Sequence, residues 1–135
     1  MSTVIDRVAN RLRGLPGVTV RATGNSLAIP PGSPDGFTVT LRVIGPRLFV
    51  VSFDGWSQTF HRAEDARDCF EFGLSDSCRL RVTLRGSTAV AWQIEKREYG
   101  LWVPGRVVQR RLVPFWRRRR IEQRQNRVFQ SDSGE

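Results

Sequence analysis

The alternation of apolar and polar residues is clearest around Asp54-Gly55, near the middle of the chain. This pair is typical of a two-residue type I′ hairpin, because both central residues of that turn take a positive φ. If Phe53 pairs with Trp56, the apolar side chains of both strands fall on one face of the hairpin. These side chains are Phe49, Val51, Phe53, Trp56 and Phe60.

After Phe60 the period changes to that of a helix, and a charged face lies opposite an apolar stripe. Small residues in the stripe would let the helix approach the sheet closely, with Phe70 inserted between them. The expected stripe consists of Ala63, Ala66, Phe70, Gly73 and Leu74. The sequence therefore predicts a helix packed on an antiparallel sheet.

Alternation returns beyond this helix in residues 80–84 and 90–94. Matching their apolar faces pairs Val82 with Trp92 and Leu84 with Val90, which requires a three-residue loop at 86–88. The outward face of this hairpin would carry Arg79, Arg81 and Arg85, which we interpret as a solvated sheet face.

The N-terminal third of the chain contributes one helix and three strands to this picture. Residues 3–13 have an apolar stripe at helical spacing that ends at Gly14. Residues 18–22 and 27–30 alternate around a glycine turn, and residues 37–43 alternate before Gly45-Pro46.

The predicted fold class is α+β, with a single domain and one antiparallel sheet of about six to eight strands. An N-terminal helix, one central helix packed on the sheet and an Arg-rich C-terminal helix complete it. A length of 135 residues suits one hydrophobic core. We expect a sheet domain over residues 1–113, a basic helix over 114–130 and a disordered acidic tail over 131–135.

Charge is concentrated near the C-terminus. The chain has a net charge of +9, and residues 104–130 hold nine arginines against one glutamate. Such a balance implies an anionic partner. On a helix that begins at Pro114, Phe115 and Ile121 would face the domain, and the opposite arc would bind the polyanion. The candidate polyanion-binding residues are Trp116, Arg117, Arg119, Arg120, Arg124 and Arg127.

Guanidinium groups fork onto phosphate oxygens and an indole stacks on bases, so nucleic acid is the first expectation for the partner. An anionic membrane surface, contacted peripherally, would suit the same residues less well. In the alternative interpretation the basic segment has no binding role: Trp116 packs on the sheet and the arginines are merely solvated.

A second class of function is an accessory or assembly protein that binds another protein or a second copy of itself. Phe72 is expected on the outer side of the central helix near His61, so these two residues form a candidate partner surface unless a terminal helix covers Phe72. The expected element order also resembles that of the small dimeric type III secretion chaperones, and this resemblance implies a chaperone-like role.

Catalysis is not expected. His61, Asp65 and Cys69 share one helical stripe, but eight residues separate the imidazole from the thiol, about 12 Å along a helix. A nucleophile and its base need hydrogen-bond contact. One histidine and two cysteines are also too few for a typical zinc site. We therefore predict no catalytic residue, no cofactor and no metal.

Localisation follows from two further features. No run of about 18 apolar residues exists that could cross a membrane, and residues 1–14 lack the apolar region of a signal peptide. We expect a cytoplasmic protein in which Cys69 and Cys78 are free thiols.

Overall fold

The computed structural model describes residues 3–126 and places them in a mixed α+β fold with two helices and two antiparallel sheets. The helices are α1 (Thr3–Arg13) and α2 (Ala63–Gly73). The first sheet has the order β1-β2-β3-β4-β5. Its strands are β1 (Arg21–Ala22), β2 (Ser26–Ile29), β3 (Val39–Gly45), β4 (Leu48–Phe53) and β5 (Trp56–Phe60).

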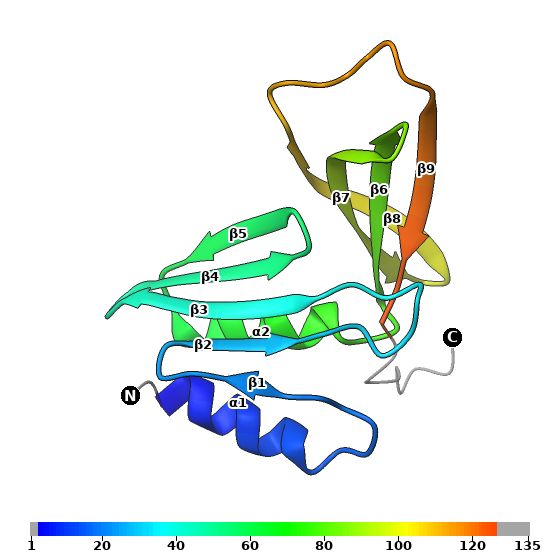
Figure 1. The fold of residues 1–135 in the computed structure, drawn as a ribbon. Helices are drawn as coiled ribbons and strands as arrows, with labels where there is room; N and C mark the ends of the chain where they lie inside the picture. The colour runs from blue at the N-terminus through cyan, green and yellow to red at the C-terminus, as the bar shows by residue number, and fades with distance from the viewer. Residues whose placement is uncertain (1–2, 127–135) are drawn as a thin grey trace.

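The second sheet has the order β8-β7-β6-β9. Its strands are β6 (Cys78–Arg85), β7 (Thr88–Glu98), β8 (Leu101–Gln109) and β9 (Arg119–Arg124). Figure 1 shows this sheet rising steeply from the end of the first one, where α2 gives way to β6. The single sheet expected from sequence is therefore wrong, because the strands after α2 form a sheet of their own.

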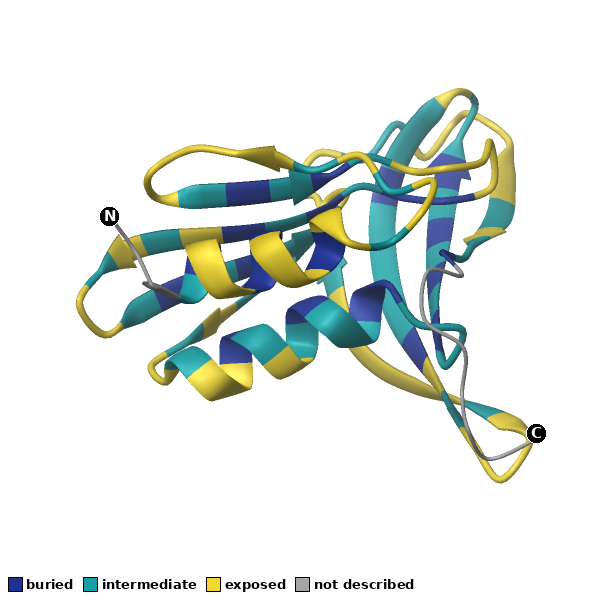
Figure 2. Cartoon of the chain, turned by 90° about the horizontal axis from the view of Figure 1, so that it is seen from below, coloured by how far each residue is buried: buried dark blue, intermediate teal, exposed yellow. Residues whose placement is uncertain are grey.

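Both helices pack on one face of the first sheet, and their outer faces are exposed (Figure 2). The predicted close approach of α2 is confirmed, since Ala66, Phe70 and Gly73 are buried. A Cβ atom at Gly73 would lie 2.3 Å from the ring of Phe53, so only glycine fits at this crossing.

The register predicted for the central hairpin is confirmed, because Phe53 pairs with Trp56 and Phe49 with Phe60. The turn differs from type I′, since only Asp54, with φ 51°, takes a left-handed conformation. Gly55 is needed for space instead: its Cβ would lie 2.3 Å from the indole of Trp92. The tip of this hairpin thus packs directly on the second sheet.

In the second sheet Val82 pairs with Trp92, as predicted. Nearer the turn a bulge after Thr83 shifts the register, so that Leu84 pairs with Ala89 and not with Val90. Because of the bulge, the connection between β6 and β7 consists of only two residues, Gly86 and Ser87. Gly86 has a φ of 62°.

The predicted C-terminal helix is wrong for residues 114–126. Within this segment, Arg119–Arg124 form β9, which pairs antiparallel with β6. Arg119 lies opposite Arg85 at one end of the pairing, and Arg124 lies opposite Leu80 at the other. A strand there satisfies the backbone groups along one side of β6 that would otherwise lack partners. Over residues 114–126, the expected element order, which resembled that of the secretion chaperones, is therefore wrong in its last element. Residues 127–130 of the predicted helix and the tail 131–135 lie outside the described residues.

Candidate functional site

The highest density of arginines lies at the top of the second sheet in Figure 1, where the β6–β7 turn meets the β8–β9 connection. The Gly86 N–H donates a hydrogen bond to the Arg118 carbonyl (2.8 Å), and the Arg110 N–H donates to the Val90 carbonyl (2.9 Å). The connection is therefore fixed to the sheet near both of its ends. We call residues 85–86 and 110–120 the arginine tip.

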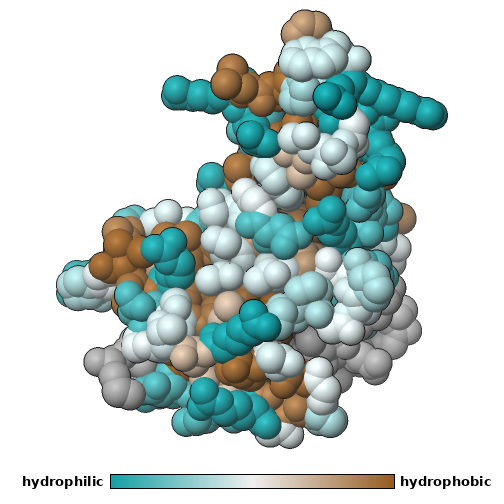
Figure 3. Space-filling model, in the orientation of Figure 1, coloured by the Kyte–Doolittle hydropathy of each residue, from teal (hydrophilic) through white to brown (hydrophobic). Residues whose placement is uncertain are grey.

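Three large apolar side chains of the arginine tip face solvent. Leu112 is 84% exposed, Phe115 76% and Trp116 71%. The two aromatic rings form an edge-to-face pair with centroids 5.5 Å apart. Figure 3 shows long hydrophilic side chains projecting at the top of the molecule, with apolar groups between them. The expectation that Phe115 docks on the domain is therefore wrong.

Most guanidinium groups of the arginine tip lack a carboxylate partner. Arg120 pairs with Glu122 at 3.0 Å. Within residues 3–126, no ion pair or hydrogen bond to a carboxylate involves the side chains of Arg110, Arg111, Arg117, Arg118 and Arg119. These exposed charges are available to an external anion.

The structure brings together four of the six predicted polyanion-binding residues, namely Trp116, Arg117, Arg119 and Arg120. Arg124 lies at the far end of β9, where its guanidinium pairs with Asp54 (2.9 Å) and Glu122 (3.3 Å). It therefore ties β9 to the central hairpin. Arg127 lies outside the described residues.

Sequence reasoning missed three of the arginines in residues 110–120. A helical projection excluded Arg118, and Arg110 and Arg111 precede the predicted helix. The plain density of basic residues from 110 to 120 would have found all three, because it assumes no secondary structure.

The outward face of the second sheet is less suited to an anion. The Arg79 Nε donates to Glu95 (2.8 Å), a carboxylate that is only 7% exposed, and the guanidinium lies 4.2 Å from the Trp102 ring centre. Arg97 pairs with Asp76 at 3.4 Å. Much of the charge on this face is neutralised within the protein, unlike that of the arginine tip.

The two residues of the candidate partner surface, Phe72 and His61, have different surroundings in the structure. Phe72 is half-buried and lines a groove between α2, β5 and the second sheet, and no residue of α1 lines this groove. His61 is exposed and does not line that groove; its Nδ1 lies 3.2 Å from the Arg47 carbonyl oxygen.

The stripe of His61, Asp65 and Cys69 does not form a nucleophilic site. His61 precedes α2, whereas burial raises the pKa of the Cys69 thiol to about 12. The thiol therefore stays protonated at neutral pH and is a poor nucleophile. Cys69 and Cys78 are free thiols.

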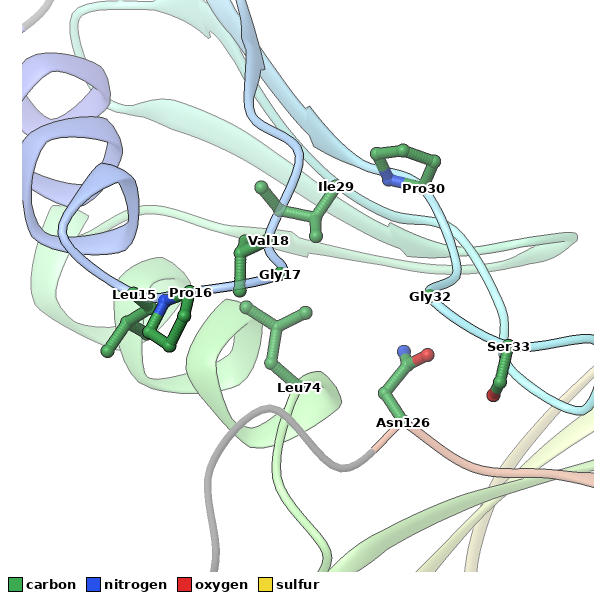
Figure 4. A pocket seen from close by; sticks show the side chains of 10 residues that line it. All are labelled: Leu15, Pro16, Gly17, Val18, Ile29, Pro30, Gly32, Ser33, Leu74 and Asn126. Atoms are coloured by element: carbon green, nitrogen blue, oxygen red, sulfur yellow. The ribbon is translucent and has the colours of Figure 1, made fainter.

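Asn126 closes a hollow of about 370 Å³ between the α1–β1 connection, the loop after β2 and the end of α2 (Figure 4). Its amide donates to the carbonyls of Phe37 (3.0 Å) and Gly73 (3.2 Å) and accepts from the Phe37 N–H (3.2 Å). Among residues 3–126, the side chains that line this hollow are all uncharged. Asn126 therefore serves as a structural clamp between segments that are distant in sequence.

Comparison of the chain with protein-family models, with curated proteins and with solved structures found no match. Neither described helix is long and apolar enough to cross a bilayer. Across residues 3–126, no cluster of three or more histidine, cysteine, aspartate or glutamate side chains is arranged to hold a metal ion.

Proposed function

We propose that this protein is a non-catalytic nucleic-acid-binding protein and that the arginine tip is its interface. The observation that carries the proposal is the set of unpaired arginines around the exposed pair Phe115 and Trp116. Each guanidinium can donate two hydrogen bonds to one phosphate, and an exposed indole provides a stacking surface for a base.

Single strands suit this surface better than duplexes, because their bases are free to stack on an aromatic side chain. The backbone hydrogen bonds of Gly86 and Arg110 fix the connection before any ligand arrives. The two ends of the connection therefore need no ordering on binding, which favours affinity. Sequence preference is expected to be weak, since stacking and phosphate contacts tolerate every base.

Replacing Trp116 with alanine tests the stacking contribution. In fluorescence anisotropy with a labelled mixed-sequence single strand, W116A is expected to bind about 5- to 150-fold more weakly, the effect of losing about 1–3 kcal/mol of stacking. Duplex affinity should change much less. Tyr99→Ala is the matched control, because Tyr99 is an exposed aromatic residue at the β7–β8 turn, outside the arginine tip.

Vesicles separate this proposal from a membrane-binding role, which the exposed Leu112 would also suit. Nucleic acid should bind in preference to phosphatidylserine-containing vesicles at equal salt. Equal single-strand affinity of W116A and the wild type, or binding to the vesicles and to neither nucleic acid, would contradict the proposal.

A further inference from the structure

The four outer edges of the two sheets in residues 3–126 differ in how well they are protected against pairing with another chain. β1 spans only two residues, β8 contains Pro104 and a bulge, and β9 carries several arginines. Short strands, prolines, bulges and charges all hinder the addition of a further strand. β5, with the sequence WSQTF, has none of these features.

The free edge of β5 offers hydrogen-bonding groups. In a two-residue hairpin Phe53 and Trp56 exchange both backbone hydrogen bonds, and bonded pairs then alternate along the strands. The N–H and C=O groups of Ser57 and Thr59 therefore point away from β4. Neither residue makes a backbone hydrogen bond to another element within the described part of the chain.

An apolar groove of about 430 Å³ runs beside this edge, between β5, α2 and the second sheet. Phe60, Phe72 and Ile94 give it an apolar lining, and Trp56 closes one end by donating a hydrogen bond from Nε1 to the Arg106 carbonyl (3.1 Å). A strand paired with β5 would direct every second side chain toward this groove.

We propose that an extended, acidic segment of a partner protein adds to β5 as a sixth strand and places alternate apolar side chains in the groove. Main-chain hydrogen bonds would provide affinity and the groove would provide selectivity. This inference stands apart from the proposed function, because no residue of the arginine tip lines the groove.

We infer that the partner segment is acidic from the charged side chains at the rim of the groove. Asp68 lies 3.7 Å from Arg67, and Lys96 lies 3.4 Å from Glu98. Arg106, which is exposed, has no carboxylate partner in the part of the chain that the structure describes. A carboxylate near the Trp56 end of the added strand would meet this cation, and the net charge of +9 favours an acidic partner in general.

A second copy of the chain is a less suitable occupant. The second sheet contacts the start of β5 through Gly55, Trp56 and Arg106, which leaves less room there for a strand that is attached to a whole folded domain. Two copies would also bring two net charges of +9 together. An isolated extended segment meets neither obstacle.

Thr59→Pro tests the added strand with little disturbance of the hairpin. The Thr59 N–H points to the free side, so proline removes a donor from the edge and leaves the bonds to β4 intact. Thr59→Ala is the matched control, because it removes the same exposed side chain and keeps the donor. Labelled peptides Asp-Val-Thr-Val-Thr-Val-Asp and their leucine and phenylalanine counterparts serve as probes.

The wild type and T59A are expected to bind at least one of these peptides with equal affinity, and T59P at least tenfold more weakly. Methylating the central amide nitrogens of the bound peptide should abolish binding to the wild type. This result tests the main-chain hydrogen bonds of the added strand even if T59P fails to fold. Arg106→Glu should weaken binding of the acidic peptide and improve that of a version with lysine in place of aspartate.

Three results would overturn the proposal. These are the absence of binding by every peptide at millimolar concentration, equal binding by T59P and T59A, or equal binding of the methylated peptide. A fourth contradicting result could come from analytical ultracentrifugation. If the wild type were a dimer and T59P a monomer, the β5 edge would bind a second copy of the chain instead.

Discussion

At the residue scale, the Asn126 side chain joins segments of the fold that are far apart in sequence. It is 7% exposed and satisfies backbone groups of Phe37 and Gly73, which are distant from it in sequence. Asn126→Ala would leave these groups buried without partners, so we expect it to lower the free energy of unfolding by about 2–4 kcal/mol.

Urea denaturation measures this loss, with Gln123→Ala as the control. Gln123 is exposed on β9, three residues away, and its removal should cost less than about 0.5 kcal/mol. Equal stabilities of N126A and Q123A would show that Asn126 is not a clamp.

The residues that could be predicted are those whose partners are close in sequence. The register of Phe53 and Trp56 follows from the short turn between them, and the small size of Gly73 from its place on a helical stripe. The role of Asn126 could not be predicted, because its partner Phe37 lies 89 positions earlier. Local sequence patterns do not indicate a contact between residues so far apart.

At the element scale, the β4–β5 hairpin contacts the second sheet so closely that it leaves no room for a methyl group. A Cβ at Gly55 would lie 2.3 Å from Trp92, so Gly55→Ala must displace either the hairpin or the indole. We expect a loss of about 1–3 kcal/mol in the free energy of unfolding.

Gly24→Ala is the control for this variant, since nothing lies within 4 Å of its added methyl group. Thermal and urea denaturation of both proteins would show the difference. If G55A were as stable as G24A, the two sheets would not be held together at this contact.

For β9, a helix was predicted from the sequence where the structure has a strand. Residues 114–126 contain arginine, glutamine and glutamate, which helices favour, and proline at the start suits a first helical turn. The deciding interaction is the pairing of Arg119–Arg124 with β6, about 40 residues earlier. Local propensity is a weak guide when a neighbouring strand offers an unsatisfied edge.

That error changed the expected site less than the expected fold. Trp116, Arg117, Arg119 and Arg120 are exposed together on the arginine tip, as they would have been on a helix. Composition alone located this part of the site. The pairing of Arg124 with Asp54 and the exposure of Phe115 depended on the strand and could not be predicted.

At the scale of the whole molecule, the arginine tip and the groove beside β5 occupy two separate places. The arginine tip lies at the far end of the second sheet (Figure 1), whereas the groove is lined by residues of β5, α2 and the second sheet. A polyanion at the tip and a peptide in the groove would not compete for the same residues. Variants of one surface should therefore leave binding at the other unchanged.

The most direct test of the arginine tip is the salt dependence of single-strand binding. With about five phosphate contacts, the wild type should give a log–log slope of about −3.5, since each contact on a single strand contributes about −0.7. The triple variant R117A/R118A/R119A should give a slope shallower by about 2. The control R7A/R13A/R47A removes the same charge from exposed sites far from the tip and should keep the wild-type slope. Equal slopes for the two triple variants, or no single-strand binding by the wild type at moderate salt, would contradict the assignment of the arginine tip as the nucleic-acid interface.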